Sequence, residues 1–230
     1  MKLLTQSFAE QESIWPGSGK HILAQFDDYT IVVYQAYRPS IARFAVTNGF
    51  LGGDFSYSRM SWCKPNFLWM MYRSGWGTKE NQERTLAIRL KRSFFDNVLA
   101  QAVPSSFDPS LFPDHESWAT AVAGSEVRLQ WDPDHGPAGT PLKRRAIQLG
   151  LRGAMLREYG GEAIVEIQDI SEFVTEQRAN LDSVKLLVPV ERAYQPADEK
   201  TVQRLGLGSR YDATEQIVGP EAPAASFSSK

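Results

Sequence analysis

The chain has 230 residues, of which 42% are hydrophobic and 23% charged, and its formal net charge is −2 at pH 7, which is typical of a soluble globular protein. No apolar run reaches the roughly 18 residues that a membrane span needs, and the N-terminal apolar stretch is too short for a signal peptide. Cys63 is the only cysteine, which excludes an intrachain disulfide and a cysteine-built zinc site and leads us to expect a cytoplasmic protein without a membrane partner.

In chain order, β-branched and alternating apolar runs predict strands, and apolar residues spaced i, i+3, i+4 between capping residues predict helices. The predicted strands cover 29–38, 54–58, 85–91, 126–131, 163–170 and 185–190. The predicted helices cover 40–49, 65–73, 93–103, 154–160 and 171–181, and a helix or mixed segment covers 142–151. Proline and glycine clusters predict loops over 104–118 and 132–141.

No linker-like stretch interrupts the middle of the chain, so we expect one globular domain over 21–204. Turn-forming residues make 1–20 a loose N-terminal segment, and a composition of Gly, Ala, Ser and Pro predicts a disordered tail over 205–230. Strands and helices alternate irregularly, which favours an α+β domain with a mainly antiparallel sheet and flanking helices. The standard Gly-rich phosphate loops are missing, which argues against P-loop or Rossmann nucleotide binding.

The most distinctive stretch is 55–92, in which Trp62, Trp69 and Trp76 are evenly spaced. From Arg59 to Arg92 it carries eight cationic side chains against two acidic ones, although the whole chain is slightly acidic. Cations interleaved with aromatic rings suit phosphates and bases, through charge-assisted hydrogen bonds and stacking. The alternative is that the tryptophans are buried and the cations are solvated.

Three places hold side chains that could act chemically. Tyr37 and Arg38 end the first strand, where Arg38 could hold a carboxylate or phosphate in a bidentate manner. Ser56 and Ser58 would share one face of the predicted strand 54–58.

The third place is the end of the strand 126–131, where Gln130 and Asp132 should point to the same side. Asp134 and His135 follow in the predicted loop, and a second Asp-His pair occurs at 114–115. Such pairs could supply metal ligands, although their spacing matches no motif that we can name and these residues are also ordinary turn formers.

Several long phrases resemble the family known as domain of unknown function 4291. They are YQAYRPSIARFAVTNG, FSYSRMSWCKPNFLWMMYRSGWGTKENQER, QWDP and RRAIQLGLRG. The resemblance extends over about 34–192, and it implies kinship without implying an activity.

A weaker resemblance is to the ADP-ribosyltransferase superfamily, whose members carry an Arg or His on a first strand, a Ser-rich second strand and a Glu near the end of a later strand. Arg38, Ser56 with Ser58, and Asp132 occur here in that order. The resemblance implies that the Arg holds NAD, the Ser orients the nicotinamide ribose, and the acid hydrogen-bonds the ribose hydroxyls as positive charge develops. This chain departs from the pattern because position 132 is Asp instead of Glu, and Glu166 is a possible substitute.

Three functions follow as hypotheses. The first is an NAD-using ADP-ribosyltransferase-like enzyme with Arg38, Ser58 and Asp132 as catalytic residues. Its further cofactor-binding residues would be Tyr37, Ser56, Arg59, Trp62, Lys64, Trp69, Arg73, Gln130 and His135. The second is a non-catalytic nucleic-acid-binding module that uses the basic and aromatic stretch 55–92. The third is a metal-dependent hydrolase that acts through Asp132, Asp134 and His135.

Overall fold

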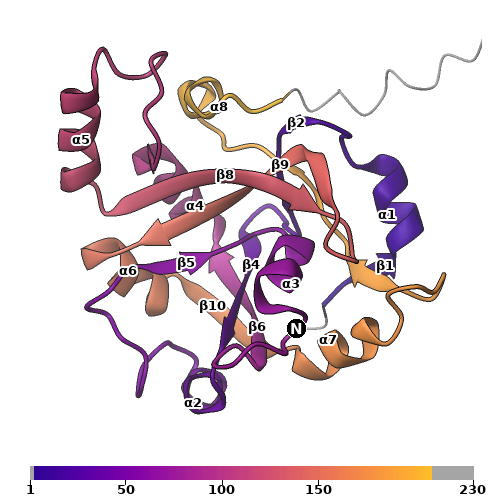
Figure 1. Cartoon of the computed structure of the whole chain (residues 1–230). Helices are drawn as coiled ribbons and strands as arrows, with labels where there is room; N and C mark the ends of the chain where they lie inside the picture. The colour runs from indigo at the N-terminus through magenta and orange to yellow at the C-terminus, as the bar shows by residue number, and fades with distance from the viewer. Residues whose placement is uncertain (1–2, 209–230) are drawn as a thin grey trace, which may run out of the picture.

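The computed structural model describes residues 3–208, in which two main sheets lie between helices on both sides (Figure 1). The smaller sheet has the antiparallel order β10–β6–β4, and the larger has the order β2–β9–β8–β7 with β5 also paired to β9. The parallel pairs among these are β2–β9 and β7–β8, so the expected α+β domain with mainly antiparallel pairing is confirmed. The main-sheet strands are β2 (Gly19–Lys20), β4 (Thr30–Tyr37), β5 (Ser61–Cys63), β6 (Arg84–Lys91), β7 (Val103–Pro104), β8 (Val127–His135), β9 (Pro141–Leu151) and β10 (Ile164–Asp169). Two smaller pairs join β1 (Thr5–Ser7) to β11 (Leu187–Pro189) and β3 (Ile22–Ala24) to β12 (Arg192–Tyr194).

Strand β5 connects the two main sheets. It pairs antiparallel with the end of β9, and the next residue, Lys64, pairs with Tyr34 of β4. Two backbone hydrogen bonds, of 2.7 and 3.3 Å between nitrogen and oxygen, hold Lys64 against Tyr34. The side chains of β5 therefore lie beside the C-terminal half of β4.

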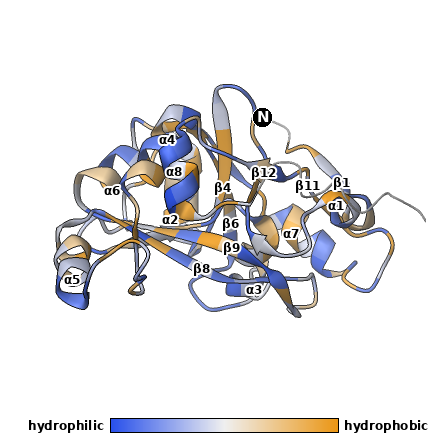
Figure 2. Cartoon of the chain, turned by 90° about the horizontal axis from the view of Figure 1, so that it is seen from above, coloured by the Kyte–Doolittle hydropathy of each residue, from blue (hydrophilic) through white to orange (hydrophobic). Residues whose placement is uncertain are grey.

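The helices cover both faces of the sheets, with α4 and α8 on one side and α3 on the other in Figure 2. Two hydrophobic clusters result, and β4 contributes Val33 to the first and Val32 to the second. Because successive strand residues point to opposite faces, a strand buried on both faces belongs to both clusters. The helices are α1 (Phe8–Ile14), α2 (Pro39–Asn48), α3 (Phe67–Ser74), α4 (Arg92–Gln101), α5 (His115–Gly124), α6 (Gly153–Gly160), α7 (Ser171–Arg178) and α8 (Glu199–Leu205). Within 3–208, none of these helices has the length and apolar character to cross a membrane.

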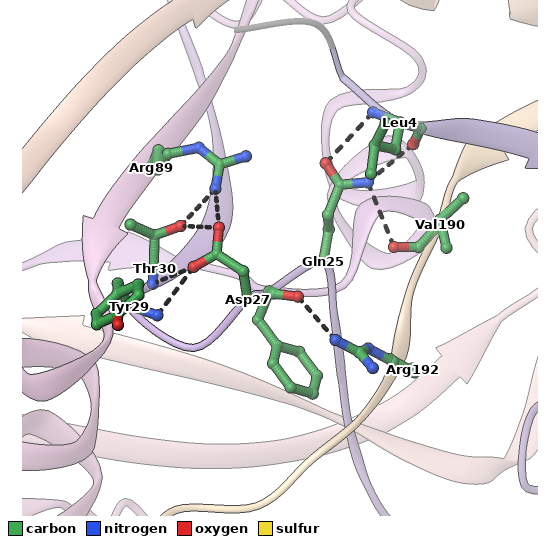
Figure 3. Close-up of polar contacts among 9 residues, drawn as sticks. Leu4, Gln25, Asp27, Tyr29, Thr30, Arg89, Val190 and Arg192 are labelled. Carbon is green, nitrogen blue, oxygen red and sulfur yellow. Dashed lines mark hydrogen bonds and ion pairs between the residues drawn. The ribbon is translucent and has the colours of Figure 1, made fainter.

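A carboxylate organises the turn that leads into β4 (Figure 3). Asp27 accepts hydrogen bonds from the backbone N–H groups of Tyr29 and Thr30, at 2.9 and 2.7 Å. Its second oxygen accepts the Thr30 hydroxyl at 2.9 Å and forms an ion pair of 3.1 Å with Arg89 of β6. The same residue thus shapes the turn and ties β4 to its neighbouring strand.

The structure confirms the strands that were expected over 29–38, 85–91, 126–131, 163–170 and 185–190, with boundaries that shift by a few residues. The helices that were expected over 40–49, 93–103, 154–160 and 171–181 are also present. Helix α3 begins at Phe67 instead of Pro65, because the Asn66 side chain accepts the Trp69 N–H at 2.6 Å and caps the helix there. Helix α5 occupies the end of the expected loop and the residues after it, with Asp114 as its N-cap.

Three predictions on local structure are wrong. Segment 142–151 is strand β9 and not a helix or mixed segment, and β8 extends to His135 through the expected loop. Strand β9 pairs on both edges and is buried on both faces near its end, so its apolar residues do not show the alternation that marks a half-buried strand. Residues 54–58 form turns instead of a strand.

The N-terminal segment is more regular than expected. Ser7 caps α1, and Ser7 and Glu10 bond to each other's backbone N–H groups in a capping box. Trp15 is buried and donates its indole N–H to the Glu191 carbonyl at 2.8 Å, so the segment is anchored to the domain. The expected disordered tail lies outside the described residues from 209 onward, whereas Leu205 is a buried residue of α8.

Candidate functional site

A pocket of about 860 Å³ lies where the end of β4, the turns of 54–60, β5 and α3 meet. More than half of the predicted site residues line it. These are Tyr37, Arg38, Ser56, Arg59, Trp62, Lys64 and Arg73. Its cationic side chains come from three separate segments of the chain, whereas Asp54 is the acidic side chain among its lining residues. The pocket therefore favours an anionic ligand.

Arg38 lies at the mouth of the pocket, directly after β4. Its neighbour Pro39 occupies the first turn of α2, which ends the strand ladder at this point. The guanidinium forms an ion pair of 3.4 Å with Asp54, but the two side chains are 46% and 56% exposed. Exposed ion pairs of this kind contribute little to stability, so Arg38 can exchange Asp54 for a ligand at small cost.

Lys64 lies deep in the pocket wall and is 3% exposed. Within residues 3–208 its ammonium forms no hydrogen bond and no ion pair, and it lies over the face of the Trp69 ring, 5.7 Å from the ring centre. Burial lowers the pKa of Lys64 to about 8, the nearby charge of Arg73 acts in the same direction, and the negative charge of Asp132 opposes this shift. An unpaired buried cation is unfavourable unless a ligand supplies the missing negative charge.

A buried glutamine holds the wall of the pocket together. The Gln35 side-chain oxygen accepts the hydroxyls of Tyr37 and Tyr159, the latter at 2.7 Å. Its amide nitrogen donates to the Ser61 hydroxyl at 3.0 Å and to the Trp62 carbonyl at 2.8 Å. Tyr37 is partly exposed, but its hydroxyl is enclosed, and burial raises the pKa of Tyr37 well above its usual value.

Asp132 lies beside the pocket on β8. Gln130 donates to one carboxylate oxygen at 2.8 Å, and Gln148 of β9 donates to the other at 2.6 Å. The prediction that Gln130 and Asp132 share a face is thus confirmed. Gln148 lines the pocket and separates it from Asp132, whereas Gln130 lines a second pocket of about 350 Å³.

The structure does not bring the remaining predicted residues into the pocket lining. Ser58 is exposed, and its hydroxyl lies 2.9 Å from that of Ser56. Trp69 and His135 are buried and stack with Tyr72, at ring distances of 5.3 and 3.5 Å respectively. Burial lowers the pKa of His135. These rings form a wall behind Lys64 instead of a surface for stacking bases.

The described residues contain no group of three His, Cys, Asp or Glu side chains that could hold a metal ion. Asp134, one of the residues considered as a ligand, is buried and forms an ion pair of 2.6 Å with Arg144. Arg144 is therefore a structural residue.

Sequence reasoning missed Gln35, Gln148 and Asp54 as parts of the site. Gln35 could have been recognised, because it is a polar residue inside an otherwise apolar and aromatic strand. Gln148 could not have been recognised, since its segment was expected to be a helix or a mixed segment and not a strand. Asp54 became relevant only when the turns of 54–60 placed it beside Arg38.

The chain belongs to the family described as "Domain of unknown function (DUF4291)", whose model matches residues 21–194. This confirms the first resemblance drawn from the sequence. No match was found among curated proteins.

Proposed function

We propose that this family member is an NAD-binding enzyme of the ADP-ribosyltransferase type that transfers ADP-ribose to an acceptor. The observation that carries the proposal is the convergence of Arg38, Arg59, Lys64 and Arg73 on one pocket of about 860 Å³. The buried and unpaired Lys64 and the three arginines fit a pyrophosphate, and the pocket also offers aromatic surface at Tyr37 and Trp62.

The proposed roles follow from the positions of the side chains. Arg38 and Arg59, exposed at the mouth, bind the phosphates, and Lys64 compensates negative charge deeper in the pocket. The Gln148 amide and the Ser56 hydroxyl also line the pocket and offer hydrogen bonds to ribose hydroxyls.

When bound, NAD supplies a glycosidic bond whose cleavage leaves positive charge on the ribose. Asp132 stabilises that charge electrostatically from its fixed position between Gln130 and Gln148. Its carboxylate accepts hydrogen bonds from two neutral side-chain amides and forms no ion pair within 3–208, although its charge also acts on the nearby Lys64.

The proposal is tested by isothermal titration of the full chain with NAD. We expect Arg38→Ala to weaken NAD binding at least about tenfold, because it removes charge-assisted hydrogen bonds. Arg43→Ala is the matched control, since Arg43 is exposed on the neighbouring helix α2 and lies outside the pocket lining. Circular dichroism should show both variants folded, because the ion pair of Arg38 is exposed.

Failure of the wild-type chain to bind NAD or ADP-ribose would overturn the proposal. Titration with a single-stranded RNA at two salt concentrations tests the alternative of a nucleic-acid-binding module. Such a module should lose affinity for the RNA steeply as the salt concentration rises. That alternative has less support, because Trp69 and Trp76 are only 6% and 7% exposed and offer no stacking platform.

A cytoplasmic location remains part of the proposal, consistent with a single, buried cysteine.

A further inference from the structure

We propose that Lys64 is a nucleophilic amine that condenses with the carbonyl group of an anionic aldehyde or ketone in the pocket and forms an imine. This activity differs from NAD binding although it uses the same pocket, and its test does not depend on whether NAD binds.

The first argument is the placement of Lys64. Alternation along β5 and the residue after it points Trp62 and Lys64 into the pocket and Cys63 into the first hydrophobic cluster. The Lys64 backbone is held by two hydrogen bonds to Tyr34, and Pro65 follows it. The amine is therefore presented from a rigid strand end.

The second argument is that the Lys64 ammonium forms no hydrogen bond and no ion pair within 3–208. A lysine buried for structural reasons is expected to have a carboxylate or an acceptor, because burying an unpaired charge is unfavourable. Lys64 has neither within 3–208 and faces the Trp69 ring instead. A desolvated lysine next to another cation is the usual setting of an amine nucleophile. The lowered pKa of Lys64, about 8, supports this, since about a tenth of the amine is neutral at pH 7.

The surrounding charges indicate the class of substrate. Arg59 and Arg73 are exposed at the pocket, and neither has a carboxylate partner in the described part of the chain. They can bind a carboxylate or a phosphate on the same molecule whose carbonyl meets Lys64. The substrate is therefore a carbonyl compound that carries an acidic group.

The chemistry needs no further reactant. The Lys64 nitrogen lone pair forms the bond to the carbonyl carbon while the carbonyl electron pair moves to oxygen, and a proton passes from nitrogen to that oxygen. The hydroxyl of this carbinolamine takes a proton from solvent and leaves as water when the carbon–oxygen bond breaks, while the nitrogen lone pair forms the carbon–nitrogen double bond and gives the protonated imine. The negative charge of Asp132, which acts on Lys64, stabilises the protonated imine.

The test is reductive trapping on the full chain. Wild-type protein is incubated with glyoxylate, glycolaldehyde phosphate or uncharged glycolaldehyde in the presence of cyanoborohydride, and the modified peptide is mapped by mass spectrometry. We expect both anionic probes to label Lys64 at least tenfold faster than exposed Lys143, and the uncharged probe to label Lys64 at least tenfold more slowly than the anionic probes. Preference for glyoxylate or for the phosphate identifies the acidic group.

Lys64→Arg keeps the positive charge but removes the amine, and should abolish the fast adduct, whereas Lys143→Arg should retain it. Equal labelling of Lys64 and Lys143 in the wild-type protein would overturn the proposal, and this comparison does not depend on whether a variant folds. Equal rates with charged and uncharged probes would overturn the assignment of an anionic substrate.

Discussion

Two adjacent residues, Cys63 and Lys64, have opposite surroundings because a strand alternates its side chains. Burial in the first hydrophobic cluster raises the pKa of the Cys63 thiol to about 12, so at neutral pH this cysteine is an inert core residue. Lys64 is as deeply buried, but it faces the pocket instead of the cluster. The direction of a side chain, and not its exposure, separates the structural residue from the candidate functional one.

The buried ammonium of Lys64 predicts a specific dependence of stability on pH. The pKa of Lys64 is about 8 in the folded chain, against an ordinary value of 10.5. Between these values the unfolded chain binds more protons, so the free energy of unfolding should rise with pH in this window, by at most about 3 kcal/mol. Below pH 8 Lys64 is charged in both the folded and the unfolded chain, so the folded chain bears the full free-energy cost of burying the ammonium.

Urea unfolding of the wild-type protein and Lys64→Met between pH 7 and pH 10.5 measures this contribution. The methionine side chain has similar length and no charge, so other titrating groups cancel in the difference between the two proteins. The variant should be the more stable protein at pH 7, and its advantage should shrink as pH rises. A difference that stays constant with pH would show that Lys64 titrates normally.

At the scale of elements, the β8–β9 pair carries both the candidate acid and a buried ion pair. Opposite residues share a face, so Gln130 and Gln148 reach Asp132 from two strands. Near the hairpin end, Asp134 and Arg144 are both buried and joined at 2.6 Å, and Arg144 also donates to the Pro16 carbonyl at 2.7 Å. The β8–β9 hairpin thus holds the N-terminal segment through Arg144 and fixes the Asp132 carboxylate beside the pocket.

Arg144→Ala should destabilise the protein by about 3–5 kcal/mol, because it leaves the Asp134 carboxylate buried without its cation. Arg145→Ala is the matched control: Arg145 is the next residue on the same strand, its side chain is exposed, and its loss should change stability by less than about 0.5 kcal/mol. Denaturant unfolding monitored by fluorescence measures both. Similar losses in the two variants would mean that the buried pair is not an important contact.

At the scale of the whole molecule, the two main sheets and the two hydrophobic clusters are joined through β4 and β5. Val32 and Val33 place the two faces of β4 in different clusters, and Lys64 continues β5 into contact with β4. A local opening of one sheet therefore disturbs both clusters. The pocket lies at this junction, so its shape depends on the integrity of the whole domain.

This connection predicts one cooperative unfolding transition. Far-ultraviolet circular dichroism, which reports backbone structure, and tryptophan fluorescence, which reports side-chain packing, should give coincident denaturant curves. A separate early transition in tryptophan fluorescence would show that the cluster around α3 unfolds on its own.

The amino-acid sequence was sufficient to predict the elements whose residues make a clear local pattern. Strand β6 and helix α4 were predictable because alternation and helical spacing depend on neighbours in the chain. The position of Arg38 at a strand end was also predictable, since Pro39 cannot donate a backbone hydrogen bond to a ladder and suits the first turn of the helix that follows. The concentration of cations in 55–92 likewise follows from composition.

Which of these residues lie together in the pocket depends on long-range contacts of the fold. Trp69 and Trp76 are core residues, and Lys64 is a buried cation without an ion-pair partner within 3–208, because their surroundings come from segments far away in the chain. Gln148 lies at the site because β9 pairs with both β5 and β8. The same pairing buries both faces of β9 near its end, so its sequence lacks the apolar–polar alternation that predicts a strand. Burial and charge compensation are properties of long-range contacts, so no local pattern could have specified them.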